Sequence, residues 1–503
     1  MRYSVPVNAP DEVAALAAAG ADELYCGYLD AWWAERYGDH DSASRRQGRA
    51  NLSTPEELES TVREARRYGL PIHLALNARY TEPQLDHLVE LCERFGDWGG
   101  TGVILSDLGL LWRLSNNRRV RDRDLTITLS LLAVAQNTAT LRAYQRLGVT
   151  RVVFPRFVSW SEAGSLLMGV PGMEASFMAF FDKCPLVDGY CRHRHGVSYL
   201  DRESAQNDDA PPLYTFDTTY RTHACLGSSC TYLEPYPCAA CHMRRFERAG
   251  VGTAKIGGRG RPLEERLRAL RFLRVAEAME SDEERRLSYR QTFDRSCACY
   301  YGKTTQSRYA IEPVVVRASG EQRVCVGSET DIDEFQRALV SLCRGEVPQT
   351  TDYAEDDVAL TLLVPPLANG TLHAFVTMVP MLIGHVPFGT HVAVNDLGTL
   401  GELTRALAPY ARNAHAPYPL RLTLGTLLAR LDDSREVEHF LSADQNPARP
   451  VWGPRGEPRM LTYAPPTDEL VRHWRTPSLA EPSAQEALDW LFCGGTRIPY
   501  EFA

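Results

Sequence analysis

The feature that most constrains the fold is a repeated alternation of short apolar runs with longer amphipathic stretches over the first 260 residues. The short runs predict β-strands, and the stretches between most of them predict helices. Strands joined through helices form a parallel sheet covered by helices, and eight such strands favour a closed (β/α)8 barrel of the TIM type. The strands are expected at residues 3–7, 23–26, 72–76, 102–106, 125–129, 151–154, 174–180 and 253–256.

The expected helices carry local start and stop signals. A hydroxyl of Ser53 or Thr54 can accept free amide protons while Pro55 starts the helix, and Gly69 and Gly148 predict left-handed stops. An open, doubly wound sheet is the alternative, but the sequence VNAP after the first strand lacks the glycine-rich turn typical of that fold. Helices are expected at residues 10–19, 55–68, 82–95, 137–147 and 159–168.

The strand–helix rhythm breaks once and then ends, which divides the chain into parts. Residues 181–251, between the seventh and eighth strands, are rich in Cys, His, Asp, Tyr and Pro. A loop of this length is usually functional, and in a barrel it opens at the catalytic face. We expect a barrel domain at 1–291 that ends in a charged helical stretch at 261–291, a connecting segment at 292–355 and a smaller C-terminal α/β domain at 356–503.

The C-terminal domain resembles part of the barrel. Residues 390–400 match residues 101–111 at six of eleven positions, and residues 420–424 resemble residues 125–129. Similarity at long spacing predicts a partial duplication of the barrel. Chance likeness between two strands that end in a turn is the alternative.

Cysteine content is the unusual part of the composition. The 503 residues include 13 cysteines and carry a net charge of −9, which excludes a basic nucleic-acid footprint over the whole molecule. The first residues lack the apolar core of a secretory signal, and prolines interrupt the apolar stretch at 374–394, so no membrane span is expected. We expect a cytoplasmic protein, in which clustered cysteines more often bind metal or act in redox chemistry than form disulfides.

Six cysteines lie close together in the insertion. Two thiolates three residues apart, as at Cys238 and Cys241, can bind one metal ion or two corners of a cluster, and thiolates favour zinc or iron–sulfur. The spacing alone leaves a zinc site and a 4Fe–4S cluster equally open. The candidate ligands are Cys184, Cys191, Cys225, Cys230, Cys238 and Cys241.

The other cysteines and the nearby histidines have simpler interpretations. Cys297 and Cys299 could form a second thiolate pair, and the remaining cysteines sit singly in apolar or amphipathic stretches that predict the core. Those single cysteines are Cys26, Cys92, Cys325, Cys343 and Cys493. The flanking histidines are expected to be loop residues or hydrogen-bond donors rather than ligands; they are His193, His195, His223 and His242.

Residues that end barrel strands point into the active site of a TIM barrel. The catalytic candidates on this basis are Asn77, Asp107, Arg156 and Lys255, and the substrate-binding candidates are Ser130, Arg156, Lys255 and Arg259. The three basic residues could bind a carboxylate or phosphate. The alternatives are ion pairing for the basic residues, turn formation for Asn77 and helix capping for Asp107, which recurs as Asp396.

Six segments resemble the collagenase-like peptidase family (family U32), in the order in which they occur there. They are GADELY at 20–25, NLSTPEEL at 51–58, LALN at 74–77, SDLGLL at 106–111, RVVFPR at 151–156 and AKIGGR at 254–259. The resemblance covers roughly residues 1–280. Residues 395–398 and 423–428 also resemble a C-terminal extension found in some members.

The resemblance implies more than the peptidase name. Relatives in this group are oxygen-independent hydroxylation proteins that act on ubiquinone precursors or on tRNA and rRNA bases, hold a 4Fe–4S cluster through four cysteines and in some cases use prephenate as the oxygen source. The first pair in that group has the spacing of Cys184 and Cys191, the third falls near Cys225, and the fourth falls where Cys238 and Cys241 stand. The resemblance therefore favours iron–sulfur over zinc.

The chain departs from the family pattern at two places. Many relatives carry Glu-x-Phe-x-His-Gly before the first cysteine, where this chain has SFMAFF at 176–181, and Gly257 replaces a frequent glutamate. No role of those family residues can therefore be transferred. Six cysteines also compete for four ligand positions.

Three functional hypotheses follow. The first is an iron–sulfur hydroxylase that takes oxygen from a small anionic donor and acts on a small molecule or an RNA base. The second is a metal-dependent or cysteine peptidase, for which Cys191 with His193 is the candidate pair, although no Gly-x-Ser-x-Gly or His-Glu-x-x-His motif is present. The third is a non-catalytic iron–sulfur or zinc scaffold for a partner enzyme. A homodimer or a partner subunit is compatible with each.

Overall fold

The fold was analysed in a computed structural model of the whole chain. The structure describes residues 1–181 except 38–42, 45, 47–49, 79 and 81, residues 236–301 except 297, and short segments within 314–424. These residues form two compact units. The first unit contains the described residues of 1–133, 147–181 and 236–301, and the second contains 134–146 and the described segments from 314 onward.

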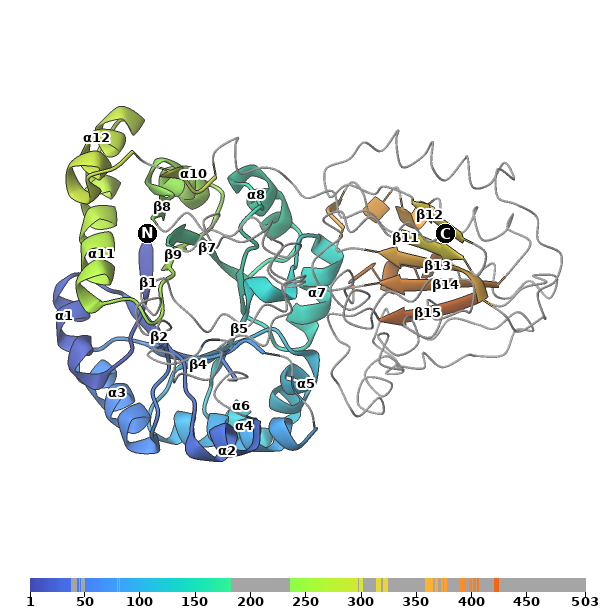
Figure 1. The fold of residues 1–503 in the computed structure, drawn as a ribbon, viewed down its shortest axis with the longest axis horizontal. Helices are drawn as coiled ribbons and strands as arrows, with labels where there is room; N and C mark the ends of the chain where they lie inside the picture. Colours follow the sequence, from blue (N-terminus) through green and yellow to red (C-terminus); the bar gives the residue numbers. More distant parts are fainter. Residues whose placement is uncertain are drawn as a thin grey trace, which may run out of the picture. The chain divides into compact units, whose positions relative to one another are not determined.

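The first unit is a closed barrel of eight parallel strands (Figure 1). Neighbouring strands pair in chain order, and β9 closes the ring by pairing with both β1 and β7. The predicted TIM-type barrel is therefore confirmed. The barrel strands are β1 (Arg2–Pro6), β2 (Glu23–Cys26), β3 (Ile72–Leu76), β4 (Gly102–Leu105), β5 (Thr126–Leu129), β6 (Arg151–Val153), β7 (Glu174–Phe180) and β9 (Thr253–Ile256).

Helices follow the strands along the chain, and local signals set their ends. Thr54 accepts a hydrogen bond from the amide of Glu57 at the start of α3, and Gly69 and Gly148 have positive φ, as the sequence predicts. In the first unit the helical elements are η1 (Pro10–Glu12), α1 (Val13–Ala18), α2 (Ala31–Tyr37), α3 (Pro55–Arg67), α4 (Glu82–Asp97), α5 (Leu108–Asn116), α6 (Arg118–Asp122), η4 (Leu131–Ala133), α8 (Trp160–Met168), η8 (Ala240–His242), α10 (Met243–Arg248), α11 (Leu263–Ala278) and α12 (Asp282–Phe293).

The charged stretch expected as one helical segment at 261–291 is two helices, α11 and α12. Ser281 begins the second helix, because its side chain accepts the Glu284 amide while the Glu284 carboxylate accepts the Ser281 amide. This reciprocal cap satisfies amides that a new helix start would otherwise leave without acceptors. Because of this break, α12 packs against η8, the short helix that contains Cys241.

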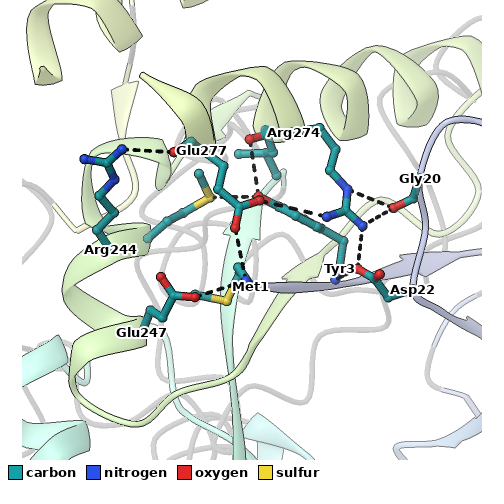
Figure 2. A network of polar contacts seen from close by, with 10 residues as sticks. Met1, Tyr3, Gly20, Asp22, Arg244, Glu247, Arg274 and Glu277 are labelled. Carbon is teal, nitrogen blue, oxygen red and sulfur yellow. Dashed lines mark hydrogen bonds and ion pairs between the residues drawn. The ribbon is translucent and has the colours of Figure 1, made fainter. Parts of the chain in front are cut away.

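Polar contacts fasten α11 to the first strand of the barrel (Figure 2). The Arg274 guanidinium donates to the carbonyl of Gly20 and to Asp22, and it stacks 4.3 Å from the centre of the Tyr3 ring. The Tyr3 hydroxyl donates to Glu277, which also accepts from the Met1 ammonium at 3.0 Å. These contacts join segments about 250 residues apart in the sequence and so hold the barrel closed on the side where its ends meet.

The amino-terminal end of the barrel, which we call the foot, is filled by paired charges. Arg151, the first residue of β6, donates to Glu23 at 2.7 Å and to Glu174 at 2.9 Å, and Glu174 also accepts from Arg2 at 2.7 Å. The side chains of Arg151 and Glu23 are 8% and 6% exposed, so their charges lie inside the barrel. Burial favours the neutral acid, but electrostatic interactions with His73 and Arg151 and the hydrogen bond from Arg151 outweigh it and lower the pKa of Glu23.

Buried His73 in β3 belongs to the same interior. Burial lowers the pKa of its imidazole to about 4. Its ring is therefore neutral at physiological pH, so the foot holds its charge in the carboxylate and guanidinium groups.

The second unit contains a mixed sheet of five strands in the order β12-β11-β13-β14-β15. The last three strands run parallel, and β11 pairs antiparallel with β12 and β13. The segment with α7 (Thr138–Arg146) joins this unit through hydrogen bonds such as Asn137 to the Leu367 carbonyl at 2.8 Å. The strands are β11 (Val314–Arg317), β12 (Gly320–Arg323), β13 (Val358–Val364), β14 (Gly389–Val394) and β15 (Leu420–Leu424).

The two segments that resemble each other in sequence also share strand register. Gly102 pairs with Thr126 in the barrel, and the matching positions His391 and Arg421 pair in the second sheet. The aspartate that follows also has the same role, because Asp396 accepts the amide three residues on, at Thr399, at 2.7 Å. The partial duplication itself stays a prediction. The domain boundaries at 291 and 355 stay predictions.

Candidate active site

The candidate site lies at the carboxyl ends of the barrel strands, which we call the mouth. Because all eight strands are parallel, the residues that follow them lie at the same end of the barrel. The structure brings to this end Asn77 after β3, Asp107 after β4, Ser130 after β5, Arg156 after β6 and Arg259 after β9. Lys255 lies within β9 and occupies the interior between foot and mouth.

Asp107 acts as the N-cap of α5. Its Oδ1 accepts the amide of Leu110 at 2.8 Å, and its Oδ2 accepts the amide of Tyr80 at 3.4 Å. The residue is 2% exposed. These contacts favour the capping interpretation over proton transfer, since both carboxylate oxygens already accept backbone amides.

Asn77 and Ser130 differ in how their polar atoms are satisfied. The Ser130 hydroxyl accepts the Leu132 amide at 3.3 Å and is buried. The Oδ1 atom of Asn77 is buried and has no hydrogen-bond partner within the described part of the chain. A buried acceptor in this condition costs free energy unless a ligand or water supplies a donor, so Asn77 is the better binding candidate.

Arg259 is a buried cation at the mouth. Its Nη2 donates to the Ser44 carbonyl at 2.7 Å, while its buried Nη1 has no hydrogen-bond partner among the residues that the structure describes. Burial lowers the pKa of this guanidinium to about 10, which still leaves it charged at neutral pH. A buried, charged donor of this kind can bind a carboxylate or phosphate oxygen.

Gly27 makes room for this guanidinium. A Cβ at Gly27 would lie 2.5 Å from Arg259 Nη1 and 2.4 Å from Asn51 Oδ1, closer than atoms in contact allow. Asn51 is held by the Ser44 hydroxyl and by the Arg46 carbonyl. Sequence reasoning missed this arrangement, and the one available signal was a glycine directly after the predicted strand at 23–26.

Lys255 is buried inside the barrel, with 8% of its surface exposed. Its ammonium lies 3.7 Å from the centre of the Tyr25 ring, and the Tyr25 hydroxyl donates to the Ile256 carbonyl at 2.7 Å. Burial, together with the charges of Arg259 and Arg151 and against the opposing charge of Glu23, lowers the pKa of Lys255 to about 7. The side chain therefore exchanges its proton near physiological pH.

Arg156 is half-buried after β6. Of the predicted basic candidates, Arg259 and Lys255 interact electrostatically with each other in the structure, and Arg156 makes contacts of its own. The binding roles of these residues stay predictions.

The cysteine-rich insertion returns to the barrel at the mouth. Cys238 in β8 (Pro237–Cys238) pairs with Phe180, the last residue of β7. Its buried thiol accepts the Ala240 amide at 3.3 Å, and Cys241 lies in the following turn, partly exposed. The other four candidate ligands, as well as His193, His195 and His223, lie outside the described residues; these cysteines are Cys184, Cys191, Cys225 and Cys230.

Cys299 joins Cys238 through strand pairing. β10 (Ala298–Cys299) runs parallel to β8 with Cys299 opposite Cys238, and the Nε2 atom of His242 lies 3.2 Å from the Cys299 sulfur. The sequence left Cys299 ambiguous because it lies 61 positions after Cys238, its partner in the strand pair. Its expected partner Cys297 lies outside the described residues.

Cys26 and Cys92 are buried core residues, as expected. Burial raises the pKa of the Cys26 thiol to about 12 and raises that of Cys92 as well. Both are therefore protonated thiols and poor metal ligands. Cys325, Cys343 and Cys493 lie outside the described residues.

The donor set at the mouth fits a thiolate-held metal group in its chemistry. Two candidate cysteines and Cys299 lie on adjoining elements next to the end of β7, and thiolates are the ligands that iron–sulfur clusters and zinc prefer. Within the described residues no three metal-binding side chains already converge on one point. A complete site would therefore need ligands from residues 184–230.

Comparisons with known proteins identify relatives of the barrel. The family model for peptidase family U32 matches residues 8–312. The tRNA hydroxylation protein P of Escherichia coli (strain K12) is 28% identical over 184 residues, which cover 35% of this chain and 37% of that protein. Its namesake in Haemophilus influenzae is 27% identical over 184 residues, 35% and 36% of the two chains. The match thus spans little more than a third of these relatives.

Among solved structures, the U32 peptidase Mk0906 is 14% identical, with a TM-score of 0.34, over 51% of this chain and 93% of that chain. The fold assignment rests on the strand order and not on this likeness. No helix within the described ranges has the length and apolar character needed to traverse a lipid bilayer.

Proposed function

The chain belongs to peptidase family U32, and from that premise we propose that it is an oxygen-independent hydroxylase that depends on an iron–sulfur cluster and acts on a base of tRNA. The relatives named tRNA hydroxylation protein P support the reaction and the acceptor. The observation that carries the proposal is the position of Cys238, which brings the cysteine-rich insertion to the end of β7. At this mouth, the Arg259 Nη1 atom has no hydrogen-bond partner among the described residues.

Four thiolates would hold the cluster. They come from the six candidate cysteines of the insertion, of which Cys238 and Cys241 lie beside the mouth. When bound, the cluster supplies an iron site that can activate the oxygen to be transferred. The barrel wall excludes bulk water from the reacting groups, which prevents loss of a reactive species to hydrolysis.

The chain's own residues would bind and orient an anionic oxygen donor, for which we propose prephenate. Arg259 would offer to a carboxylate its Nη1, which has no hydrogen-bond partner in the described part of the chain, and Arg156, which follows β6 at the same end of the barrel, would bind a second negative charge. Asn77 offers a buried amide group, and Ser130 a hydroxyl, for orientation. Lys255, inside the barrel, would hold or release a proton, because its pKa lies at about 7.

The acceptor would approach at the same end of the barrel. The net charge of −9 gives no general attraction for RNA, so binding would depend on local basic groups or on a partner subunit. We therefore expect weak, salt-sensitive binding of tRNA by the isolated protein. A homodimer or a partner enzyme would enlarge the surface available to bind tRNA.

Anaerobic purification tests the cofactor. We expect a brown protein with about four iron and four sulfide per chain, as a 4Fe–4S cluster requires, and loss of both in Cys238→Ser. The matched control is Cys92→Ser, a buried cysteine outside the mouth, which should keep its iron. A colourless protein loaded with zinc would refute the iron–sulfur proposal.

Isotope transfer tests the reaction. Oxygen-18 placed in the hydroxyl group of prephenate should appear in a tRNA nucleoside after incubation with the iron-loaded protein under argon. Absence of label with normal hydroxylation would remove prephenate as the donor. Cleavage of a peptide by iron-free protein would instead support the peptidase hypothesis, and iron without any activity would support a scaffold.

A further inference from the structure

Lysine is almost absent from this chain. Of its 55 basic side chains, lysine accounts for three, at positions 183, 255 and 303, and arginine supplies the rest. Arginine therefore serves nearly every role in which only positive charge is needed. A lysine at a buried position suggests a role that needs a primary amine, which arginine cannot supply because it does not deprotonate in proteins.

The surroundings of Lys255 do not hold it as a structural cation. Its amine contacts the face of the Tyr25 ring and has no hydrogen bond or ion pair within the part of the chain that the structure describes. A buried ammonium in a structural role is usually paired with a carboxylate. Glu23, the acid that interacts with it, is instead paired with Arg151 at 2.7 Å.

The charged and titratable groups around the amine come from several barrel strands and from the loop after β9. They are Glu23 and Tyr25 on β2, His73 on β3, Arg151 on β6 and Arg259 after β9. Burial and the two guanidinium groups favour the neutral amine, whose pKa lies at about 7. A neutral amine is a nucleophile, and desolvated lysines of this kind form Schiff bases with carbonyl substrates.

Arg259 defines what the carbonyl compound would carry. It follows Lys255 by four positions, interacts with it electrostatically and has an unpartnered Nη1 atom among the described residues. A guanidinium beside an amine matches a carboxylate beside a ketone. We propose that Lys255 forms an imine with the ketone of a 2-oxo acid whose carboxylate is bound by Arg259.

The step balances without an oxidant or reductant. The Lys255 nitrogen adds its lone pair to the ketone carbon and forms a C–N bond, while a proton moves from nitrogen to the ketone oxygen. The hydroxyl group then takes up a proton from solvent, the C–O bond breaks as the nitrogen lone pair forms the C=N bond, the oxygen leaves as water, and a protonated C=N bond remains. Hydrolysis reverses each step, so the 2-oxo acid can be held and released.

This inference deepens the proposed function and rests on it for the natural ligand, since prephenate carries a 2-oxo acid side chain. The covalent chemistry itself needs no iron. Failure of the hydroxylase proposal and failure of the imine proposal can therefore be told apart, because the imine is measured on iron-free protein with pyruvate alone.

The test is reductive trapping with pyruvate and cyanoborohydride, which delivers hydride to the imine carbon and leaves a stable secondary amine. Peptide mass spectrometry should find the adduct on Lys255 and leave Lys303 unmodified. The trapping rate should rise with pH, with a midpoint near 7, because only the neutral amine adds to the ketone. Equal labelling of all three lysines, or none at Lys255, would overturn the proposal.

Variants separate the covalent role from a structural one. Lys255→Arg should abolish the adduct, while the matched control Lys303→Arg should keep it. Arg259→Met retains the amine, and it should raise the pyruvate concentration for half-maximal trapping roughly tenfold to hundredfold, as expected for loss of a charged hydrogen bond. An unchanged concentration dependence would contradict the role of Arg259 even if Lys255→Arg failed to fold.

Discussion

The buried Arg151 at the foot of the barrel is paired with carboxylates, whereas the buried Arg259 at the mouth has no ion pair among the residues that the structure describes. Arg151 contacts two carboxylates at the foot, at 2.7 and 2.9 Å. At the mouth, Arg259 has a buried Nη1 without a partner among the described residues. Inside the barrel, the Lys255 amine lies over the Tyr25 ring and has no ion pair within the described ranges. The same barrel therefore satisfies its charges at one end and leaves donors available at the other.

This difference indicates that the foot contributes to stability and the mouth to ligand binding. A buried pair is strongly destabilised when one partner is removed, because the other charge stays buried and uncompensated. A buried charge without a partner costs stability in the folded protein and is retained where it binds a ligand. Substitutions at the foot should thus lower stability, while substitutions at the mouth should change binding and leave or even improve stability.

The largest expected effect is at the foot. Arg151→Ala should lower the free energy of unfolding by about 3–5 kcal/mol, because Glu23 loses its buried partner. Urea unfolding of the iron-free protein measures the change. A loss below about 1 kcal/mol would show that the foot is not the stabilising end and would break the comparison.

The next effect has the opposite sign. Lys255→Met should raise the free energy of unfolding by on the order of 2–4 kcal/mol at pH 6, because each pKa unit of depression costs about 1.4 kcal/mol and the lost ring contact offsets part of the gain. The native protein should gain stability as the pH rises from about 7 towards 10.5, since the unfolded chain then binds the extra proton.

The gain from Lys255→Met should therefore shrink towards zero near pH 10.5. Thermal midpoints of both proteins across this range provide the check. A variant less stable than the native protein at pH 6 would mean that Lys255 is a structural cation and would contradict its assignment to the binding end.

His73 should make the foot sensitive to acid. The pKa of its imidazole is about 4 in the folded protein and 6.5 in the reference state, so the unfolded chain binds more protons in between. Stability should be complete above pH 6.5 and should fall by roughly 1.4 kcal/mol per pH unit on the way to 4. In His73→Gln this part of the pH dependence should disappear, as thermal unfolding from pH 8 to 4 can show.

The smallest effect is expected at the outer edge of the foot. Arg2→Ala removes the Arg2–Glu174 pair, whose side chains are 47% and 51% exposed, and should cost less than about 1 kcal/mol. Urea unfolding measures this cost as well, so that Arg2→Ala is the matched control for Arg151→Ala. A cost equal to that of Arg151→Ala would show that the position at the foot, and not burial of the pair, sets the stability.

Most of the fold could be predicted from local sequence. The expected strands at 23–26, 72–76, 174–180 and 253–256 match β2, β3, β7 and β9 at both ends. Strands inside a barrel are apolar and short, and capping residues mark the helices between them, so the signal is contained within a few residues. The break between α11 and α12 was missed, although Ser281 followed three residues later by Glu284 is a capping-box pattern.

The candidate site was predictable only in part. Parallel strands imply that strand-end residues share one end, which places Asn77, Arg156 and Arg259 correctly. The hydrogen bonds, ion pairs and pKa values of these side chains were not predictable, because the residues that surround them come from distant segments of the chain. The capping role of Asp107 was one of two open interpretations, and the structure favours it.

The sequence by itself determined the alternation of strands and helices, and hence the barrel. It also determined which cysteines and basic residues are available for a site. Only the tertiary structure decided which charges meet: Glu23 and Arg151 are 128 residues apart in the chain, and Cys238 faces Cys299 through a strand pair. Periodicity and capping are local interactions, whereas the pairing and pKa of a buried group depend on what the closed barrel packs around it. The pKa of the Lys255 amine is lowered because the closed barrel buries it.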